Sequence, residues 1–271
     1  MQHAPFPLPS GPPPGAVWLV GAGPGDPGLL TLRALGALRG ADIVFYDALP
    51  GTAVLRYVPH GVELVNVGKR KGCAPTPQSA IGEALVVAAR AGLRVVRLKG
   101  GDPSLFGRSG EETRALTDAG VPWDVVPGVT SASAAAAAAG IPLTLRGGAS
   151  NVTFVTGHGS SGELPGNTDW DAVGRTGGTV VAYMAMSRLD EVALRLLTAG
   201  RGADTPVAVV SRATLPGQSV LRTTLGACTL AVRRAAVPTP ALVIIGEVAR
   251  TARNSAGGQV AHADDALAAL P

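Results

Sequence analysis

The sequence predicts an α/β protein of two domains, the first built on a parallel sheet and the second on a mixed sheet, with a cleft between them. Three observations support this prediction. Near-continuous apolar segments alternate with alanine- and leucine-rich helical patterns, the rhythm of a parallel sheet covered on both faces. The 271 residues, 46% hydrophobic and 15% charged, are enough for two modest domains with real cores. Residues 140–150 read GIPLTLRGGAS, whose Gly and Pro cannot continue a helix.

The first domain is expected over residues 16–142, after a proline-rich leader at residues 1–15 that we expect to be flexible. Apolar, β-branched runs predict its strands at residues 17–20, 42–46, 62–67, 94–98 and 123–126. Helical patterns predict its helices at residues 29–39, 78–91, 110–119 and 131–139. Thr76 is the expected cap of the second helix, with Pro77 at its first position, and Gly140 ends the last one.

A linker at residues 143–150 leads to the second domain, which is expected over residues 151–250. Its strands are predicted at residues 152–156, 179–183, 207–211, 220–223 and 242–245, and its helices at residues 189–199 and 225–236. Residues 251–271 are polar and rich in Ala and Gly, so we expect a flexible tail.

The composition argues against several function classes. The formal net charge is +4, but the basic residues are scattered, which favours an anionic small molecule over nucleic acid. No apolar run approaches the roughly 18 residues of a membrane helix, and the leader lacks the features of a signal peptide. Cys73, Cys228 and His158 have no partners at metal-ligand spacing, so no metal site or disulfide framework is expected. We therefore expect a cytoplasmic protein without a bound metal.

The stretch GAGPGDPG after the first strand formally matches the glycine fingerprint of dinucleotide-binding proteins. In that fingerprint, backbone N–H groups bind the pyrophosphate, yet Pro24 and Pro27 have no N–H to donate. Asp26 would also place a carboxylate beside the phosphates. The match is therefore weak, and an NAD-binding or non-catalytic nucleotide domain remains an alternative, as does a tight turn without a ligand.

The fourth predicted strand is followed by Gly100, Gly101, Asp102 and Pro103, which present bare backbone and one carboxylate. Ligands of open α/β sheets bind outside the carboxyl ends of the strands. The two glycines allow a flat group to approach the backbone because no Cβ is in the way. Asp102 offers an acceptor for a charge-assisted hydrogen bond.

Ten motifs follow one another along the chain: VGAGPGDPGLLTL, VFYDALP, VGKRKG, RLKGGDPSLFGRSGEE, VVPGVTSA, AGIPLT, VTGH, YMAMSRL, TPVAVV and PALVIIGEV. On these motifs the chain closely resembles the tetrapyrrole methylase family over residues 17–248, and within it the uroporphyrinogen-III C-methyltransferases. The resemblance implies two α/β domains, S-adenosylmethionine in the cleft between them, and a homodimer. It also implies methylation of uroporphyrinogen III at C2 and C7, giving precorrin-2 via precorrin-1 in siroheme or cobalamin biosynthesis, with S-adenosylhomocysteine as the by-product.

The resemblance also assigns roles to individual residues. The cofactor-binding residues would be Pro24, Gly100, Gly101, Asp102, Leu105, Thr130, Ser131, Met184 and Ala213. Asp47 would accept a proton and Lys69 would donate one, whereas Asp47 could instead stabilise a turn and Lys69 could be a solvated loop charge. Arg70, Arg108 and Arg146 are candidates for binding the substrate carboxylates, with plain surface charge as the alternative. Met184 could equally be a core methionine, and Thr130 and Ser131 could cap a helix.

Two departures from the family pattern concern substrate binding. Leu145 stands where the family usually has His, and Ser109 interrupts the usual RGGEE. The main rival function is a sister C-methyltransferase that acts on a later corrinoid precursor with the same cofactor. A ribosomal-RNA methylase of the same superfamily would need a basic surface, which the scattered charge does not favour.

Overall fold

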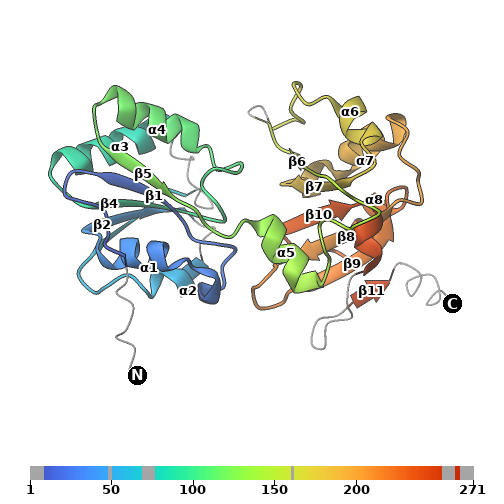
Figure 1. The fold of residues 1–271 in the computed structure, drawn as a ribbon, viewed down its shortest axis with the longest axis horizontal. Coiled ribbons are helices and arrows are strands. Elements are labelled where there is room, and N and C mark those ends of the chain that lie inside the picture. Colours follow the sequence, from blue (N-terminus) through green and yellow to red (C-terminus); the bar gives the residue numbers. More distant parts are fainter. Residues whose placement is uncertain (1–8, 48–50, 69–76, 160–161, 252–259, 263–271) are drawn as a thin grey trace. The chain divides into compact units, whose positions relative to one another are not determined.

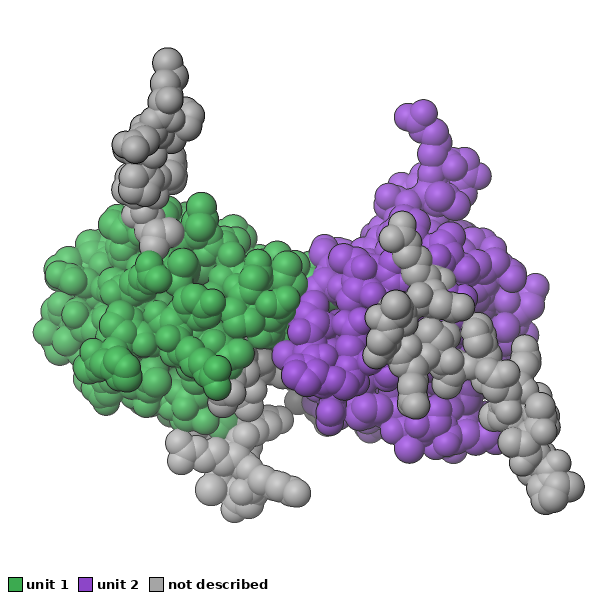
Figure 2. All heavy atoms as spheres, turned by 90° about the horizontal axis from the view of Figure 1, so that it is seen from below, with its two compact units in different colours: residues 1–131 green, residues 132–271 purple. Residues whose placement is uncertain are grey.

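The computed structural model describes residues 9–47, 51–68, 77–159, 162–251 and 260–262. The chain divides into two compact units, Met1–Ser131 and Ala132–Pro271, drawn in green and purple in Figure 2. Each unit contains one sheet, and both sheets carry helices, so the structure confirms the predicted α/β class. None of the described helices has the length and apolar character that a membrane span needs.

Unit 1 is built on a five-stranded parallel sheet with the order β3-β2-β4-β1-β5. Its strands are β1 (Val17–Gly21), β2 (Ile43–Tyr46), β3 (Glu63–Asn66), β4 (Val95–Lys99) and β5 (Trp123–Val126). Its helices are α1 (Leu32–Arg39), α2 (Gly51–Leu55), α3 (Gln78–Arg90) and α4 (Ser109–Asp118), with a 3-10 turn at Pro27–Leu29. Apolar residues of α3 and α4 pack on one face of the sheet, and those of α1 and α2 on the other (Figure 1). The parallel sheet is thus covered on both sides, as its continuous apolar strands predicted.

Unit 2 contains a six-stranded mixed sheet with the order β11-β9-β8-β10-β7-β6. Its strands are β6 (Val152–Thr156), β7 (Thr179–Tyr183), β8 (Pro206–Ser211), β9 (Ser219–Thr224), β10 (Ala241–Ile245) and β11 (Val260–His262). Its helices are α5 (Ser131–Ala139), which begins at the last residue of unit 1, α6 (Trp170–Arg175), α7 (Leu189–Thr198) and α8 (Cys228–Arg234), with 3-10 turns at Met186–Arg188 and Glu247–Thr251. One face of the sheet is buried under α6, α7 and α8.

Two of the predicted helices begin later in the structure than the sequence suggested. Helix α1 begins at Leu32 rather than residue 29, because a separate 3-10 turn precedes it and the Thr31 side chain accepts the Ala34 N–H at 3.0 Å. Helix α8 begins at Cys228 rather than residue 225, because the Leu225 N–H is bonded to the Thr205 carbonyl at 2.8 Å. Pro77 is the N-cap of α3, and Thr76 lies outside the described residues.

The segment before β1 lies directly on helix α1. A Cβ at Gly36 would lie 2.0 Å from the Pro9 carbonyl oxygen, and one at Gly40 would lie 2.9 Å from the Gly11 Cα. The Gly15 N–H donates to the Leu93 carbonyl at 3.1 Å. This part of the leader therefore touches the helix backbone at positions where only glycine fits.

Candidate active site

The carboxyl ends of β1, β4 and β5 meet through backbone atoms. Gly23 and Gly101 exchange two hydrogen bonds, with N···O distances of 3.2 and 2.7 Å. A Cβ at Gly128 would lie 2.3 Å from the Gly101 carbonyl oxygen, and one at Gly21 would lie 2.5 Å from the Gly128 nitrogen. This edge of the parallel sheet is thus bare backbone, the arrangement that open α/β sheets use for ligands.

Gly101 adopts a left-handed conformation with φ of +69°. A Cβ at this position would face the Ser131 nitrogen at 3.8 Å and the Thr130 Cα at 4.0 Å. Gly101 is therefore a neighbour of Thr130 and Ser131 in unit 1, although almost thirty residues separate them along the chain. All three are predicted cofactor residues.

Both carboxylate oxygens of Asp102 accept backbone hydrogen bonds. Oδ1 accepts the Ser104 N–H at 2.7 Å, and Oδ2 accepts the Gly128 N–H at 3.0 Å. The side chain thereby ties the loop after β4 to the loop after β5. Sequence reasoning assigned Asp102 to the cofactor, and the geometry adds a structural role that the sequence did not reveal.

Replacing Asp102 by asparagine is expected to lower the free energy of unfolding by about 1–3 kcal/mol, because the amide NH₂ cannot accept one of these two N–H bonds. Urea unfolding measures this change. Asp26→Asn is the matched control, since only one oxygen of the exposed Asp26 accepts a backbone N–H, from Gly28 at 2.8 Å. Equal stability of the two variants would show that the Asp102 bonds contribute little.

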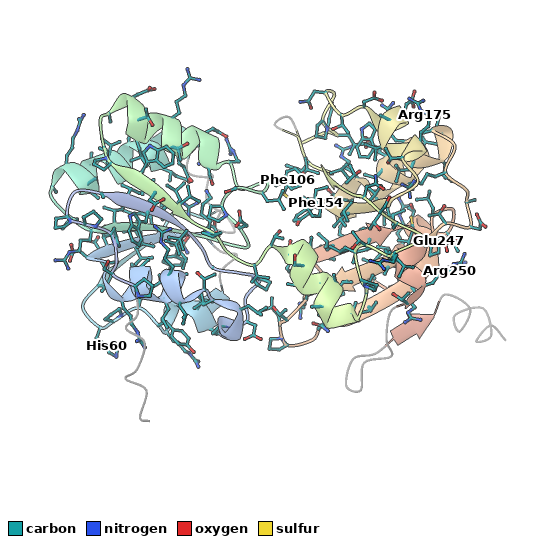
Figure 3. All side chains as sticks on the ribbon, viewed as in Figure 1. His60, Phe106, Phe154, Arg175, Glu247 and Arg250 are labelled. Atoms are coloured by element: carbon teal, nitrogen blue, oxygen red, sulfur yellow. The ribbon has the colours of Figure 1, made fainter. Side chains whose placement is uncertain are left out.

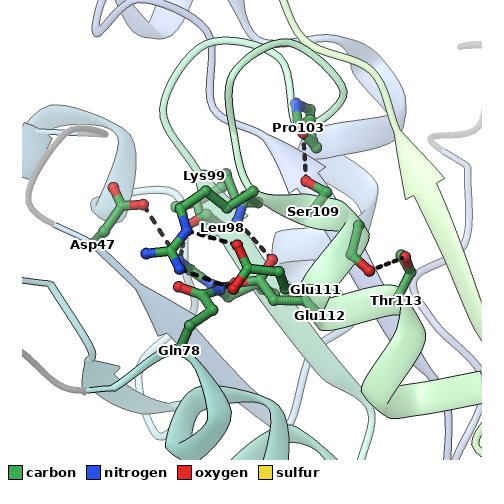
Figure 4. A network of polar contacts seen from close by, with 12 residues as sticks. Asp47, Gln78, Leu98, Lys99, Pro103, Ser109, Glu111, Glu112 and Thr113 are labelled. Carbon is green, nitrogen blue, oxygen red and sulfur yellow. Dashed lines mark hydrogen bonds and ion pairs between the residues drawn. The ribbon is translucent and has the colours of Figure 1, made fainter. Parts of the chain in front are cut away.

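Four charged side chains and one amide form an ion cluster in unit 1, defined as Asp47, Gln78, Arg97, Lys99 and Glu112 (Figure 4). Glu112 of α4 is fully buried and contacts both cations of β4, with Nε of Arg97 at 2.9 Å and Nζ of Lys99 at 2.6 Å. The Gln78 amide donates to Glu112 at 3.1 Å, and Arg97 also reaches Asp47 at 3.4 Å. The predicted proton acceptor thus lies at one end of a buried charge network.

Burial governs the electrostatics of this cluster. Desolvation lowers the pKa of Lys99 below its ordinary value, the neighbouring Arg97 charge lowers it further, and Glu112 acts in the opposite direction. A buried carboxylate is tolerated only when donors satisfy it, and Glu112 receives hydrogen bonds from three side chains. Breaking any one of these bonds would leave a buried charge without a partner, which costs free energy, so the cluster keeps one arrangement.

The loop between β4 and α4 is held in a strained conformation. Phe106 and Arg108 have φ of 52° and 55°, and the Ser109 hydroxyl donates to the Pro103 carbonyl. Phe106 is an exposed aromatic side chain of this loop, labelled in Figure 3.

Arg108 forms an ion pair with Glu111. Its Nε and Nη2 donate to the two carboxylate oxygens of Glu111, each at 2.8 Å. These bonds raise the pKa of Arg108 and lower the pKa of Glu111. Arg108 also lines a cavity of about 380 Å³ with Phe106 and Trp123.

Unit 2 has a comparable strand edge. Strands β6 and β7 are parallel, and β7 and β8 are both antiparallel to β10, so the carboxyl ends of β6, β7 and β8 share one edge. Met184 follows β7 with φ of 51° and is 48% exposed, which excludes the alternative of a core methionine. Arg212 and Thr214, on either side of Ala213, follow β8 with φ of 47° and 68°.

Backbone strain in the described part of the chain is concentrated at these two edges. The non-glycine residues with positive φ are Phe106, Arg108, Met184, Arg212, Thr214 and Ala236. Phe106, Arg108 and Met184 lie in motifs named in the sequence analysis, and Arg212 and Thr214 flank the predicted cofactor residue Ala213. Because such conformations cost about 1–3 kcal/mol each, they are characteristic of functional sites.

The start of α5 is bound by a side chain from β7. The Ala132 N–H donates to the Tyr183 hydroxyl at 3.2 Å, and Tyr183 packs edge-to-face on Phe154, labelled in Figure 3, with ring centroids 5.9 Å apart. Thr130 and Ser131 directly precede this bond. Tyr183 thus holds the helix start next to two predicted cofactor residues.

The remaining predicted residues are divided among three parts of the chain. Pro24, Gly100 and Leu105 lie at the unit 1 edge, and Arg146 is exposed in a turn of unit 2 that the Leu145 N–H closes on the Ala149 carbonyl at 2.8 Å. Lys69 and Arg70 lie outside the described residues. Among the residues that are described, no group of three or more His, Cys, Asp or Glu could hold a metal ion.

Sequence reasoning missed Arg97, Lys99 and Glu112. The available signal was two cations inside the otherwise apolar run VVRLK, which is a buried strand. Charged residues in such a strand need a buried counter-ion, and the acidic pair at the start of the next helix contains it.

The comparisons with known proteins agree on one family. The model for Tetrapyrrole (Corrin/Porphyrin) Methylases matches residues 16–229. A Sinorhizobium protein named uroporphyrinogen-III C-methyltransferase is 47% identical over 236 residues, which cover 87% of this chain and 84% of the relative. The chain spans only 50% of a Gluconacetobacter diazotrophicus siroheme synthase to which it is 49% identical.

Two solved structures have the same fold. The uroporphyrin-III C-methyltransferase of Thermus thermophilus, in complex with S-adenyl homocysteine, is 42% identical with a TM-score of 0.74, covering 87% of this chain and 99% of that one. A cobalt precorrin-4 methyltransferase of cobalamin biosynthesis is 29% identical with a TM-score of 0.77, covering 87% and 96%. From the family match and these identities, the chain belongs to the tetrapyrrole methylase family.

Proposed function

We propose that this chain is a uroporphyrinogen-III C-methyltransferase that uses S-adenosylmethionine to methylate C2 and C7, giving precorrin-2 via precorrin-1 in siroheme or cobalamin biosynthesis. The observation that carries the proposal is the bare glycine edge of unit 1, next to Asp102, Thr130 and Ser131. The names of the Sinorhizobium and Thermus proteins support the substrate, and the bound S-adenyl homocysteine of the Thermus structure supports the cofactor.

The cofactor requires a site that admits a flat adenosyl group and excludes water. When bound, S-adenosylmethionine supplies a methyl group activated by its sulfonium. The backbone at Gly100 and Gly101 would accept the adenosyl group because no Cβ blocks it. Asp102 would offer the free lone pairs of its two oxygens, while Pro24, Leu105, Met184 and Ala213 complete the set named by the family resemblance. Orientation supplies most of the rate enhancement in such a transfer.

Asp47 is the proposed proton acceptor. A pyrrole carbon that takes a methyl group leaves the macrocycle cationic, so the macrocycle must lose a proton, and a positioned base assists this step. The Asp47 side chain is 23% exposed and follows β2, so it can be reached from solvent while Arg97 fixes it. Lys69 remains the proposed donor.

Three arginines are the proposed substrate-binding residues. The substrate carries several carboxylates, which Arg70, Arg108 and Arg146 would bind. Arg108 is paired with Glu111 at 2.8 Å, so it would have to exchange that partner for a substrate carboxylate. A homodimer, which the family resemblance implies, and a cytoplasmic location, which the composition and the two separated cysteines favour, are further parts of the proposal.

A sister enzyme that methylates a later corrinoid precursor is the second candidate, favoured by the TM-score of 0.77 to the cobalt precorrin-4 methyltransferase. Incubation with uroporphyrinogen III and S-adenosylmethionine separates the two. Mass spectrometry should find a product with two added methyl groups, whereas an unchanged substrate would favour the sister enzyme. Calorimetry with S-adenosylhomocysteine beside NAD tests the dinucleotide alternative.

Replacing Gly101 by alanine is expected to weaken S-adenosylhomocysteine binding at least about tenfold, or about 1.4 kcal/mol, because the methyl group would enter the space beside Thr130 and Ser131. Isothermal calorimetry measures the affinity. Gly120→Ala is the matched control, because Gly120 has φ of +68° and a Cβ there would meet nothing within 4 Å. Both variants carry the same left-handed strain. Equal affinity in both would remove Gly101 from the cofactor site.

A further inference from the structure

We propose that Arg97 is a positioning residue that holds Asp47 for proton transfer, and that the buried Glu112 fixes Arg97 in turn. This inference rests on the proposed role of Asp47 as proton acceptor. Neither Arg97 nor Glu112 carries a role in the motif assignments above.

The guanidinium of Arg97 is fixed on three sides. Nε donates to Glu112 at 2.9 Å, Nη1 donates to the Leu98 carbonyl at 2.8 Å, and Nη2 reaches Asp47 at 3.4 Å. The group is planar and rigid, so two fixed bonds determine the direction of the third. Arg97 is only 4% exposed, so water does not compete for these bonds. Nη2 therefore meets Asp47 from one constant direction.

Glu112 anchors this arrangement from the opposite side. Its Oε1 accepts from Arg97 and from Gln78, and its Oε2 accepts from Lys99. These partners come from β4 and α3, and Glu112 itself belongs to α4, so three elements of unit 1 fix the carboxylate (Figure 4). Glu112 has no exposed surface and cannot bind substrate directly in this conformation. Its role in the reaction would be exerted through Arg97.

Asp47 is the solvent-facing member of the charged groups of the ion cluster. Its side chain is 23% exposed, whereas those of Arg97, Lys99 and Glu112 are at most 5% exposed. A proton that Asp47 accepts can therefore leave to solvent from its exposed side. The cluster thus orients the acceptor and leaves one side of it open to solvent.

The test is a double-mutant cycle between Arg97→Gln and Asp47→Asn in the full chain. Arg97→Gln alone is expected to lower kcat about 10²-fold, with KM for uroporphyrinogen III and the affinity for S-adenosylhomocysteine unchanged. Adding Arg97→Gln to Asp47→Asn should then change kcat by less than about threefold, because Arg97 acts only through Asp47. Single-turnover transfer of a radiolabelled methyl group resolves these slow rates.

Arg201→Gln is the matched structural control. Arg201 of unit 2 is half-buried and donates to the carbonyls of Gly174 and Gly178 at 3.2 and 2.8 Å. Its loss should lower the unfolding temperature and leave kcat unchanged. If Arg97→Gln does not fold, Arg97→Lys keeps the charge, loses the fixed geometry, and enters the same cycle with the same expected result.

Three results are distinguishable. A parent chain that does not methylate uroporphyrinogen III contradicts the proposed function itself. If the parent is active and the kcat of Asp47→Asn lies within threefold of the parent value, Asp47 is not the proton acceptor. That result overturns the inference, because the inference rests on that role. If the fold-loss of kcat in the double variant equals the product of the two single losses, Arg97 acts independently of Asp47. That result also overturns the inference.

Discussion

Asp47→Asn is expected to lower turnover of uroporphyrinogen III by about 10²–10⁴-fold, the usual contribution of a positioned general base. Asparagine is nearly isosteric and can still accept the hydrogen bond of Arg97, but it cannot take a proton. The affinity for S-adenosylhomocysteine should barely change, because Asp47 follows β2 and is not among the proposed cofactor residues. Steady-state turnover and calorimetry measure the two quantities.

Asp42→Asn is the control for this prediction. Asp42 lies at the opposite end of β2 and accepts the Arg94 N–H at 2.8 Å, a bond that an asparagine oxygen also makes. Its turnover should match that of the parent. Turnover of Asp47→Asn within about threefold of the parent, with both proteins folded, would favour a local structural role for Asp47.

Gly128→Ala is expected to lower the free energy of unfolding by about 3 kcal/mol, at the upper end for overpacking. The added Cβ would lie 2.3 Å from the Gly101 oxygen and 2.8 Å from the Gly21 Cα, and both are backbone atoms that cannot rotate away. The strands that carry them would have to separate. Urea unfolding, with the midpoint and slope both fitted, measures the loss.

Gly166→Ala is the matched substitution, because a Cβ there would meet nothing within 4 Å. Its effect should stay within about 0.5 kcal/mol, as for other surface changes. Similar stability of the two variants would mean that the strand ends can move apart at little cost, and would weaken the argument for a rigid glycine edge.

The strands could be predicted from the sequence because each buried strand appears in it as a short apolar run. The bounds of β5, β6 and β7 agree with the prediction, and the other predicted strands differ by one or two residues. Helices α2 and α6 were not predicted, because five and six residues are too few to show a helical period. Strand β11 lies in a segment whose polar composition gives no strand signal.

The candidate site was predictable only in part. Gly101, Asp102 and Met184 could be predicted as site residues because they lie in recognisable motifs. The residues that contact them could not be predicted, because no motif indicates these contacts. Glu112 meets Arg97 and Lys99 only after α4 folds back on β4, and the two N–H bonds of Asp102 depend on where the next strand ends. Contacts between separate elements are a property of the fold, and no local pattern encodes them.

The contact between Pro9 and Gly36 has an evolutionary consequence. With the Pro9 oxygen 2.0 Å from the place of a Cβ, any amino-acid substitution at Gly36 displaces the leader from α1. Such a mutation becomes tolerable only in a lineage whose leader has already shortened or moved. Leader and helix are therefore expected to diverge together among descendants of this protein, so that position 36 gains side chains only where the leader has been lost.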